Sequence, residues 1–512
     1  MNEKEKPRQN DNNPTGRVRS TAACDACRAR KVRCIYLPDK IKCSMCTELG
    51  VECTQVRPRK KRGPKNRYVE SLRARLDVEP GIDPSFGDSP DLSSPSLPAT
   101  SPQSISCDIE HIASLPVLQQ LVEDWFGWIH PVAPIFHRAQ ILDRIMQAQT
   151  ANNGSDPSFL ILVASLCAAV VASLRRRRGL YGAVTVDGCF DTAERLGLWD
   201  RHRRISLEWV LAMYNFTSAT HHEQGIGSPL AHRLSAETAM GVKYLLYHDF
   251  DQMSILDQQV LKRLYWLIYA AQCTFDMHGW PLLVLRQAYE QVNALIPLDV
   301  PVEGLVEGIS EASHAFPSQS YIPGLNALAR LFLIWQASQS VPIKTMEHLQ
   351  ESMKQAQQAL ADLPPQLKWR SRPGSPMNGE DRVVDGDFGT DVQTVNLKVT
   401  QLHIRANLLE QMNGLARAQN VLLTPTFISE ERHRVVDELL DLLYHMPNEV
   451  FDANGYSVVP KIRDIGGALL DEVRTGVFGA NQQASLNLNR LLAKLEELDV
   501  RCQEDQLQGN FI

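Results

Sequence analysis

The stretch CDACRARKVRC, residues 24–34, is followed eight residues later by CSMCTELGVEC, residues 43–53. Each half has the spacing C-x2-C-x6-C, and thiolates at such spacings are soft ligands typical of zinc sites. Two separate tetrahedral sites would need eight ligands, whereas six suffice if two sulfurs bridge two Zn2+ ions. The repeat therefore predicts a small module, residues 21–55, that folds around two Zn2+. Its predicted metal ligands are Cys24, Cys27, Cys34, Cys43, Cys46 and Cys53.

Two other uses of clustered cysteines fit this pattern less well. A redox C-x-x-C pair usually stands alone beside alternating strands and helices, and no such alternation is found here. An iron–sulfur cluster takes four cysteine ligands, which would leave two of the six unused. The remaining cysteines are scattered singly, and the polar N-terminus has no apolar core of a signal peptide. We therefore expect reduced core thiols in a reducing compartment. These are Cys107, Cys167, Cys189, Cys273 and Cys502.

Positive charge is concentrated at the N-terminal end and in one half of the repeat. Residues 1–75 hold 20 Lys and Arg against 8 Asp and Glu, a net charge of +12, whereas the other residues carry −18. The six residues between the second and third cysteines are RARKVR in the first half. In the second half they are TELGVE, with two Glu and no basic residue. A basic end on an acidic body predicts a module for double-stranded DNA. The first helix should enter the major groove, where basic side chains donate to guanine. The candidates are Arg28, Arg30, Lys31 and Arg33.

A basic linker follows the cysteine module. Residues 56–76 begin with VRPRKKRGPKNR, which can neutralise backbone phosphates and also reads as a nuclear import signal. Residues 68–76 predict a short helix with heptad spacing, too short for a stable coiled coil, so any homodimer should be weak. Residues 1–20 read as a disordered tail, and 77–106 as a Pro- and Ser-rich tether. The candidate DNA contacts in the linker are Arg59, Lys60, Lys61, Arg62 and Lys65.

The rest of the chain predicts one large helical domain, so the fold class is mainly α. Apolar residues recur with helical periodicity through 107–370 and again in 392–512, with a polar loop at 371–391 between them. The most apolar stretch, 159–174, is too short to cross a membrane and fits a buried helix. We expect Arg175–Arg178 to be the solvated end of that helix, although a second nucleic-acid patch is the alternative. His221, His222 and Glu223 predict a surface loop rather than a metal site. No catalytic motif occurs, so the chain is not expected to be an enzyme.

The first half of the repeat, Ala23 to Cys34, together with CSMC and GVEC in the second, resembles the fungal binuclear zinc-cluster transcription factors. The resemblance implies that Cys24 and Cys43 bridge the metals. It also implies that Lys31 is the best candidate for a base contact in a CGG-like triplet, with Arg30 next, and that Arg28 and Arg33 clamp phosphates. The family often has Pro two residues before the fourth cysteine, whereas Pro38 lies five residues before Cys43 here.

A looser resemblance covers residues 109–367, which are similar to the middle homology region of these regulators. It is carried by Trp125–Phe136 and by Lys262, Arg263 and Trp266; the family's aspartate is replaced by Gln272 or lies out of register at Asp276. The resemblance implies a nuclear regulator of RNA polymerase II genes that controls a metabolic or secondary-metabolite gene set. Its partners would be DNA, the transcription machinery and a small-molecule inducer. The alternative is a ligand-sensing or enzymatic helical domain with an appended DNA-binding module.

Overall fold

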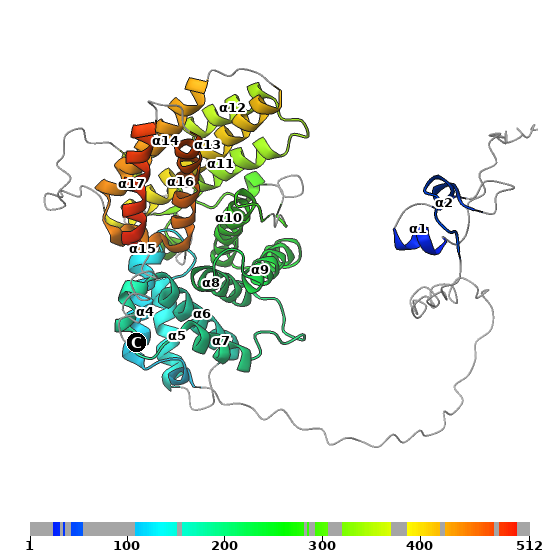
Figure 1. The fold of residues 1–512 in the computed structure, drawn as a ribbon. Coiled ribbons are helices and arrows are strands. Elements are labelled where there is room, and N and C mark those ends of the chain that lie inside the picture. Colours follow the sequence, from blue (N-terminus) through cyan, green and yellow to red (C-terminus); the bar gives the residue numbers. More distant parts are fainter. Residues whose placement is uncertain are drawn as a thin grey trace, which may run out of the picture. The chain divides into compact units, whose positions relative to one another are not determined.

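The computed structural model describes residues 24–30, 34–35, 42–54, 108–150, 156–280, 284–285, 292–305, 320–369, 387–419, 425–475 and 481–498. The chain divides into two compact units, residues 1–99 and 100–512 (Figure 1). Within the described residues both units consist of helices and turns without a strand, which confirms the mainly α prediction. The N-terminal unit contains two short helices, α1 (Asp25–Ala29) and α2 (Ser44–Glu48).

The large unit is built from helices joined by short connections. Several begin at a Ser, Thr or Asp whose side chain accepts a backbone N–H of the first turn, as in α6, α8 and α10. The α-helices are α4 (Leu115–Asp124), α5 (Arg138–Thr150), α6 (Pro157–Ser173), α7 (Val186–Arg195), α8 (Leu207–Gln224), α9 (Pro229–His248), α10 (Ile255–Met277), α11 (Ile322–Gln339), α12 (Met346–Gln358), α13 (Phe388–Ala418), α14 (Pro425–His445), α15 (Asn448–Asn454), α16 (Val459–Thr475) and α17 (Asn481–Leu498). The short helical turns are η1 (Ile109–His111), η2 (Trp125–Ile129), η3 (Arg175–Leu180), η4 (Phe250–Gln252), η5 (Val292–Leu295), η6 (Val302–Leu305), η7 (Pro365–Leu367) and η8 (Gly455–Ser457).

Helix α6 lies in the middle of the first half of the large unit. Every residue from 159 to 172 is buried, because α4, α7 and α8 pack around it. A helix that is apolar on all sides is stable in water only when it is enclosed in this way. The expectation of a buried helix at 159–174 is therefore confirmed. Among the described residues, no helix combines the length and apolar composition that a bilayer crossing requires.

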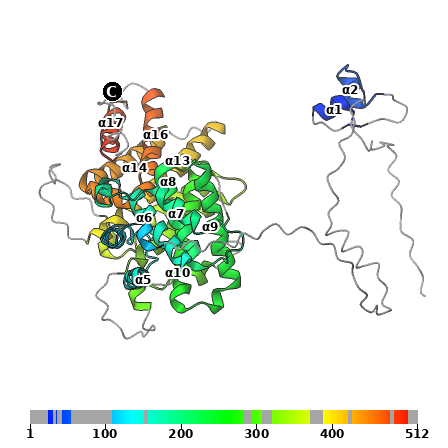
Figure 2. The same cartoon turned by 90° about the horizontal axis from the view of Figure 1, so that it is seen from below.

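Helix α13 joins the two hydrophobic cores of the large unit. One of its faces, with Val395 and Val399, packs into the core shared with α14, α16 and α17. The opposite face, with Leu408 and Met412, packs into the core shared with the helices from α4 to α12. Figures 1 and 2 show α13 among the helices of both groups. Since a single helix contributes to both cores, residues 100–512 form one continuous unit.

Helix α10 holds the irregular chain that follows it. The buried Arg263 guanidinium donates to the carbonyl oxygens of Pro134, at 3.0 Å, and Val300, at 2.7 Å. The Trp266 indole N–H donates to the Leu295 carbonyl at 2.9 Å. These hydrogen bonds satisfy backbone groups that no regular element pairs. Arg263 and Trp266, two of the residues that carry the resemblance to the middle homology region, thus have a structural function in this chain.

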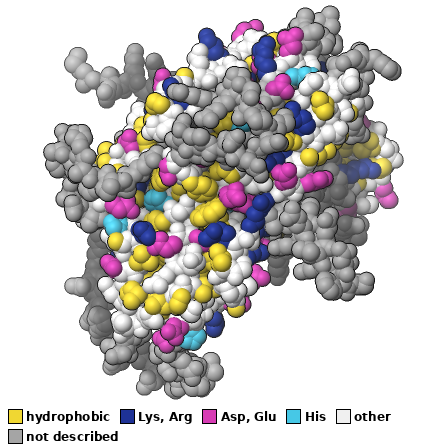
Figure 3. All heavy atoms as spheres, turned by 90° about the vertical axis from the view of Figure 1, so that its left-hand side faces the viewer, with side chains coloured by type: hydrophobic (Ala, Val, Ile, Leu, Met, Phe, Trp, Pro, Cys, Tyr) yellow, Lys and Arg dark blue, Asp and Glu magenta, His cyan; other side chains and the backbone are white. Residues whose placement is uncertain are grey.

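The four arginines at 175–178 form η3 and bind other helices, so the expectation of a solvated helix end is wrong. Arg177 pairs with Asp124 on α4 at 2.8 Å. Arg176 pairs with Asp452 on α15 at 3.1 Å, and the other two arginines reach α8. Each of the four guanidinium groups is paired with a carboxylate of another helix, which also disfavours a second nucleic-acid patch. On the face in Figure 3, basic and acidic side chains of the described residues are interspersed.

Two further expectations can be compared with the described residues. His221, His222 and Glu223 lie in the last turns of α8 rather than in a surface loop, because that helix continues to Gln224. The thiols of Cys167, Cys189 and Cys273 are buried and free, whereas Cys107 and Cys502 lie outside the described residues. The same holds for the tail at 1–20, the linker and heptad segment at 56–76, the tether at 77–106 and most of the loop at 371–391. Helix α13 begins at Phe388, within the last part of that loop.

Candidate metal centre and nucleic-acid interface

The two halves of the cysteine repeat fold in the same way. Cys24 precedes α1 and Cys43 is the N-cap of α2. In each half the sulfur of the first cysteine accepts the backbone N–H of the second, Cys27 or Cys46, at 3.4 Å. A sulfur that caps a helix N-terminus is surrounded by N–H dipoles, which stabilise a thiolate. The C-x2-C spacing therefore produces both the helical turn and a pair of converging thiols.

The halves are interlocked through their backbones. The Asp25 N–H at the start of α1 donates to the carbonyl of Thr54, the residue after the last cysteine of the second half, at 2.8 Å. The Ser44 N–H at the start of α2 donates to the carbonyl of Ile35, the residue after the last cysteine of the first half, at 2.9 Å. Each helix is thus held by the end of the other half. This reciprocal pairing was not predicted from the sequence. The one feature of the sequence that points to it is the equal spacing of the cysteines in the two halves.

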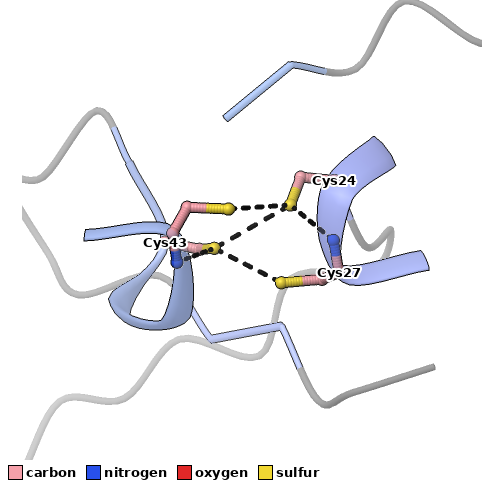
Figure 4. A group of neighbouring side chains, drawn as sticks. Cys24, Cys27 and Cys43 are labelled. Carbon is pink, nitrogen blue, oxygen red and sulfur yellow. Dashed lines mark hydrogen bonds between the residues drawn. The ribbon is translucent and has the colours of Figure 1, made fainter. Parts of the chain in front are cut away.

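Four sulfurs converge to distances that zinc would require. Cys24 Sγ lies 3.8 Å from Cys43 Sγ and 3.6 Å from Cys46 Sγ, and Cys27 Sγ lies 3.6 Å from Cys43 Sγ (Figure 4). Two thiolates on one zinc, with Zn–S bonds of about 2.3 Å at tetrahedral angles, are about 3.8 Å apart. All four sulfurs lie within 4.8 Å of one another, and their side chains are buried. The donor set and the spacing therefore fit a zinc–thiolate centre.

The other two cysteines of the repeat, Cys34 and Cys53, contact different members of this group. The half-buried Cys34 thiol interacts with Cys27 and Cys43, and its sulfur accepts the Cys24 N–H at 3.5 Å. The half-buried Cys53 interacts with Cys24 and Cys46. Cys34 also interacts with Cys24. The thiols of Cys24 and Cys43 thus each interact with cysteines of both halves.

The two central thiols are also the ones whose pKa values are lowered. Desolvation raises the pKa of Cys24, but the hydrogen bond from the Cys27 N–H and those from neighbouring thiols lower it more, to about 6. The pKa of Cys43 is lowered for the same reason: desolvation opposes ionisation, and the Cys46 N–H and surrounding thiols outweigh it. Thiolates rather than thiols bind metal, so the lowered pKa values of Cys24 and Cys43 favour metal binding at these two positions.

The predicted DNA-contacting residues fall only partly within the described residues. Arg30 lies exposed in the turn after α1. The backbone of Arg28 lies in α1. At the position equivalent to Lys31, the second half has Gly50, whose positive φ of 62° suits glycine. The other predicted contacts lie outside the described residues. They are Lys31, Arg33, Arg59, Lys60, Lys61, Arg62 and Lys65.

Comparison with known proteins places the cysteine module in a described family. Residues 22–63 match the fungal Zn(2)-Cys(6) binuclear cluster domain. The azaphilone cluster-specific transcription factor azaR of Aspergillus niger is 25% identical over 310 residues, which are 54% of this chain and 62% of that protein. Since 54% of the chain is far more than the cysteine module, the similarity extends into the helical unit.

Shorter matches are confined to about the length of the module. The citrinin biosynthesis transcriptional activator mrl3 of Monascus ruber is 40% identical over 60 residues, 12% of this chain and 11% of that protein. The maltose fermentation regulatory protein MAL13 of Saccharomyces cerevisiae is 40% identical over 57 residues, 11% of each chain. The chain thus covers less than two thirds of the length of each of these relatives. No solved structure matches. The family and these names are those of transcription factors, not enzymes.

Proposed function

We propose that this chain is a transcription factor of the fungal zinc-cluster type and that it binds two Zn2+ ions through all six cysteines of its repeat. Cys27 and Cys34 would bind one ion and Cys46 and Cys53 the other, with Cys24 and Cys43 shared by both. The observation that carries the proposal is the convergence of the sulfurs of both halves to 3.6–3.8 Å. The ions would supply a structural cross-link in a module too small for a hydrophobic core.

The charge of the two halves determines which of them faces DNA. The halves have the same backbone hydrogen bonds, but only the first has basic residues between its second and third cysteines. In the second half the corresponding surface, Thr47 to Gly50, is exposed and contains an acidic residue, Glu48. A polyanion would be repelled there and attracted to α1 and the turn after it. We therefore assign Lys31 and Arg30 to base edges and Arg28 and Arg33 to phosphates.

The linker would add affinity without sequence preference. Each phosphate that it neutralises contributes about 0.9 to the slope of log affinity against log salt concentration. The five basic residues from Arg59 to Lys65 would therefore make binding strongly dependent on salt. We propose a CGG-like triplet as the target and a nuclear location. The names of the azaphilone and citrinin regulators favour a secondary-metabolite gene set transcribed by RNA polymerase II.

The test is selection of preferred sites from random duplex DNA by the full-length chain, followed by affinity measurements for wild type and two variants. Lys31→Ala should reduce the preference for the selected site over a scrambled site by about 5- to 150-fold, equivalent to about 1–3 kcal/mol. The matched control is Lys42→Ala, since Lys42 is an exposed lysine of the same module outside its helices. It should weaken both DNAs equally. An unchanged preference in Lys31→Ala, or an equal loss in both variants, would refute the assignment. The spacing of selected sites also reports whether a homodimer binds.

A further inference from the structure

A cavity of about 180 Å3 lies inside the large unit, where segments distant in the sequence meet. Its walls come from α8, α9, α10, α11, α13 and α16, together with the short helices next to them. Much of the lining is apolar, with Phe275, Leu328 and Phe332 among the wall residues. An apolar protein cavity of about 150 Å3 accommodates benzene. This cavity is therefore large enough for a compact ring with one or two small substituents.

The walls also include buried polar atoms without a hydrogen-bond partner. They are Ser235 Oγ, Gln272 Nε2 and Asn396 Oδ1, on side chains that are 5%, 1% and 4% exposed. Each such atom costs about 1–3 kcal/mol relative to a satisfied one. Three of them around one cavity indicate a site that is completed by something else.

The orientation of the two amides is determined by hydrogen bonds to their other ends. Gln272 Oε1 accepts the N–H groups of Val284 and Leu285, at 3.2 and 3.1 Å, so Nε2 is the group left over. Asn396 Nδ2 donates to Asn454 Oδ1 at 2.9 Å, and Asn454 in turn donates to two carbonyl oxygens. Asn396 Oδ1 is therefore a hydrogen-bond acceptor without a donor, and Gln272 Nε2 is a donor without an acceptor.

Among the described residues, Lys461 is the one lysine that lines the cavity, and it is 2% exposed. Its Nζ donates to Thr400 Oγ1 at 2.8 Å and lies 5.6 Å from the centre of the Phe332 ring. Burial lowers its pKa to about 7, and no carboxylate of the described residues offsets this effect. A buried ammonium group with a single neutral acceptor is stabilised strongly by an anion. Thr400 and Asn396 are one turn apart on α13, which places Lys461 and the Asn396 acceptor at the same end of the cavity.

We propose that the cavity binds a compact hydroxylated aromatic carboxylate. The ring would pack against Phe275, Leu328 and Phe332, the carboxylate would bind Lys461, and a ligand hydroxyl would donate to Asn396 Oδ1. Because the walls come from both hydrophobic cores, the ligand would cross-link α8–α11 to α13–α16 and stabilise their arrangement. The site lies wholly in the large unit, so this inference goes beyond the proposed DNA binding and does not depend on it.

The experiment uses the full-length chain, with 3-hydroxybenzoate as the probe and phenol and benzylamine as comparison ligands. Calorimetric titration should show saturable binding of 3-hydroxybenzoate, at least tenfold tighter than phenol and absent for benzylamine. Lys461→Met should weaken 3-hydroxybenzoate at least tenfold. The matched control is Lys494→Met, since Lys494 is 9% exposed and pairs with Glu497 away from the cavity. This variant should bind as wild type does.

A second variant keeps the test decisive if Lys461→Met does not fold. Ser235→Leu removes the unpaired hydroxyl and fills part of the cavity from α9, and it should abolish binding while the thermal unfolding transition persists. Saturable binding that both cavity variants retain would overturn the proposal. So would the absence of saturable binding to wild type, or equal affinity for the anionic and cationic probes. DNA binding of the same preparations is measured separately, which distinguishes failure of this site from failure of the zinc module.

Discussion

The Asp124 carboxylate connects α4 to η3, and removing its charge should destabilise the large unit. The side chain is 5% exposed and accepts two hydrogen bonds from Arg177, at 2.8 and 3.1 Å. It also accepts the buried Tyr181 hydroxyl at 2.7 Å and the Gln120 amide at 3.1 Å. In Asp124→Asn one acceptor oxygen becomes a donor, so at least one of these four hydrogen bonds is replaced by two donors facing each other.

The expected loss follows from burial on each side of the pair. Breaking a fully buried ion pair by changing one partner costs about 3–5 kcal/mol. Arg177 is 31% exposed, and water can solvate part of its guanidinium, so the loss is reduced to about 2–4 kcal/mol. Unfolding entropy is about 2.1 cal/mol/K per residue, or about 0.8 kcal/mol/K for a unit of about 400 residues. The expected decrease in Tm is therefore about 3–5 °C.

Thermal unfolding of full-length wild type and variants, followed by circular dichroism, measures this decrease. The matched control is Glu237→Gln, which removes the charge from an exposed pair with Arg233 within α9. Its Tm should change by less than 1 °C, because exposed ion pairs contribute little. If Asp124→Asn changes Tm no more than the control does, the arginines of η3 are not structural. The alternative of a nucleic-acid patch would then regain support.

Three other predictions concern the zinc module, a glycine and buried histidines. A zinc chelator should abolish DNA binding of the full-length chain in a mobility-shift assay yet leave the main thermal transition unchanged, because the cysteines lie in the separate unit. Gly455 has a φ of 53°, and a Cβ added there would meet the His222 side chain. Gly455→Ala should therefore lower the free energy of unfolding in urea by about 1–3 kcal/mol. The control Gly414→Ala has open space around the added Cβ and should raise that free energy by about 0.5–1 kcal/mol. Burial lowers the pKa of His403 to about 4, an effect that Asp464 opposes and that His278 and Lys461 assist. Below about pH 6.5 the unfolded state therefore binds more protons than the folded state, and the free energy of unfolding decreases as the pH is lowered. Between about pH 7 and pH 5 this decrease is about 2 kcal/mol, and His403→Gln should lack it.

Sequence periodicity was sufficient for elements whose environment is uniform along their length. The buried α6 was predictable because an unbroken apolar run must be enclosed, and the mainly α class followed from the scarcity of alternating β-branched residues. Periodicity was insufficient for charged runs. Arg175–Arg178 read as solvated because their acceptors, on α4, α8 and α15, lie far away in the sequence. Likewise His221 and His222 read as a loop because the sequence there is polar, whereas α8 continues through it to Gln224.

At the cysteine module the sequence by itself was enough to predict six ligands, and the structure brings the sulfurs of Cys24, Cys27, Cys43 and Cys46 together. The proposed direction of DNA binding rests on the sequence, because charge asymmetry between equivalent segments is a local property. Only the tertiary structure decided how the halves interlock and that a cavity lined by a buried lysine exists. Asn396 and Lys461 lie 65 residues apart, and their proximity depends on the packing of α13 against α16. A pattern of residue types determines local geometry, because neighbouring residues set it. The desolvation of a side chain and the loss of its hydrogen-bond partners arise only when distant segments pack together.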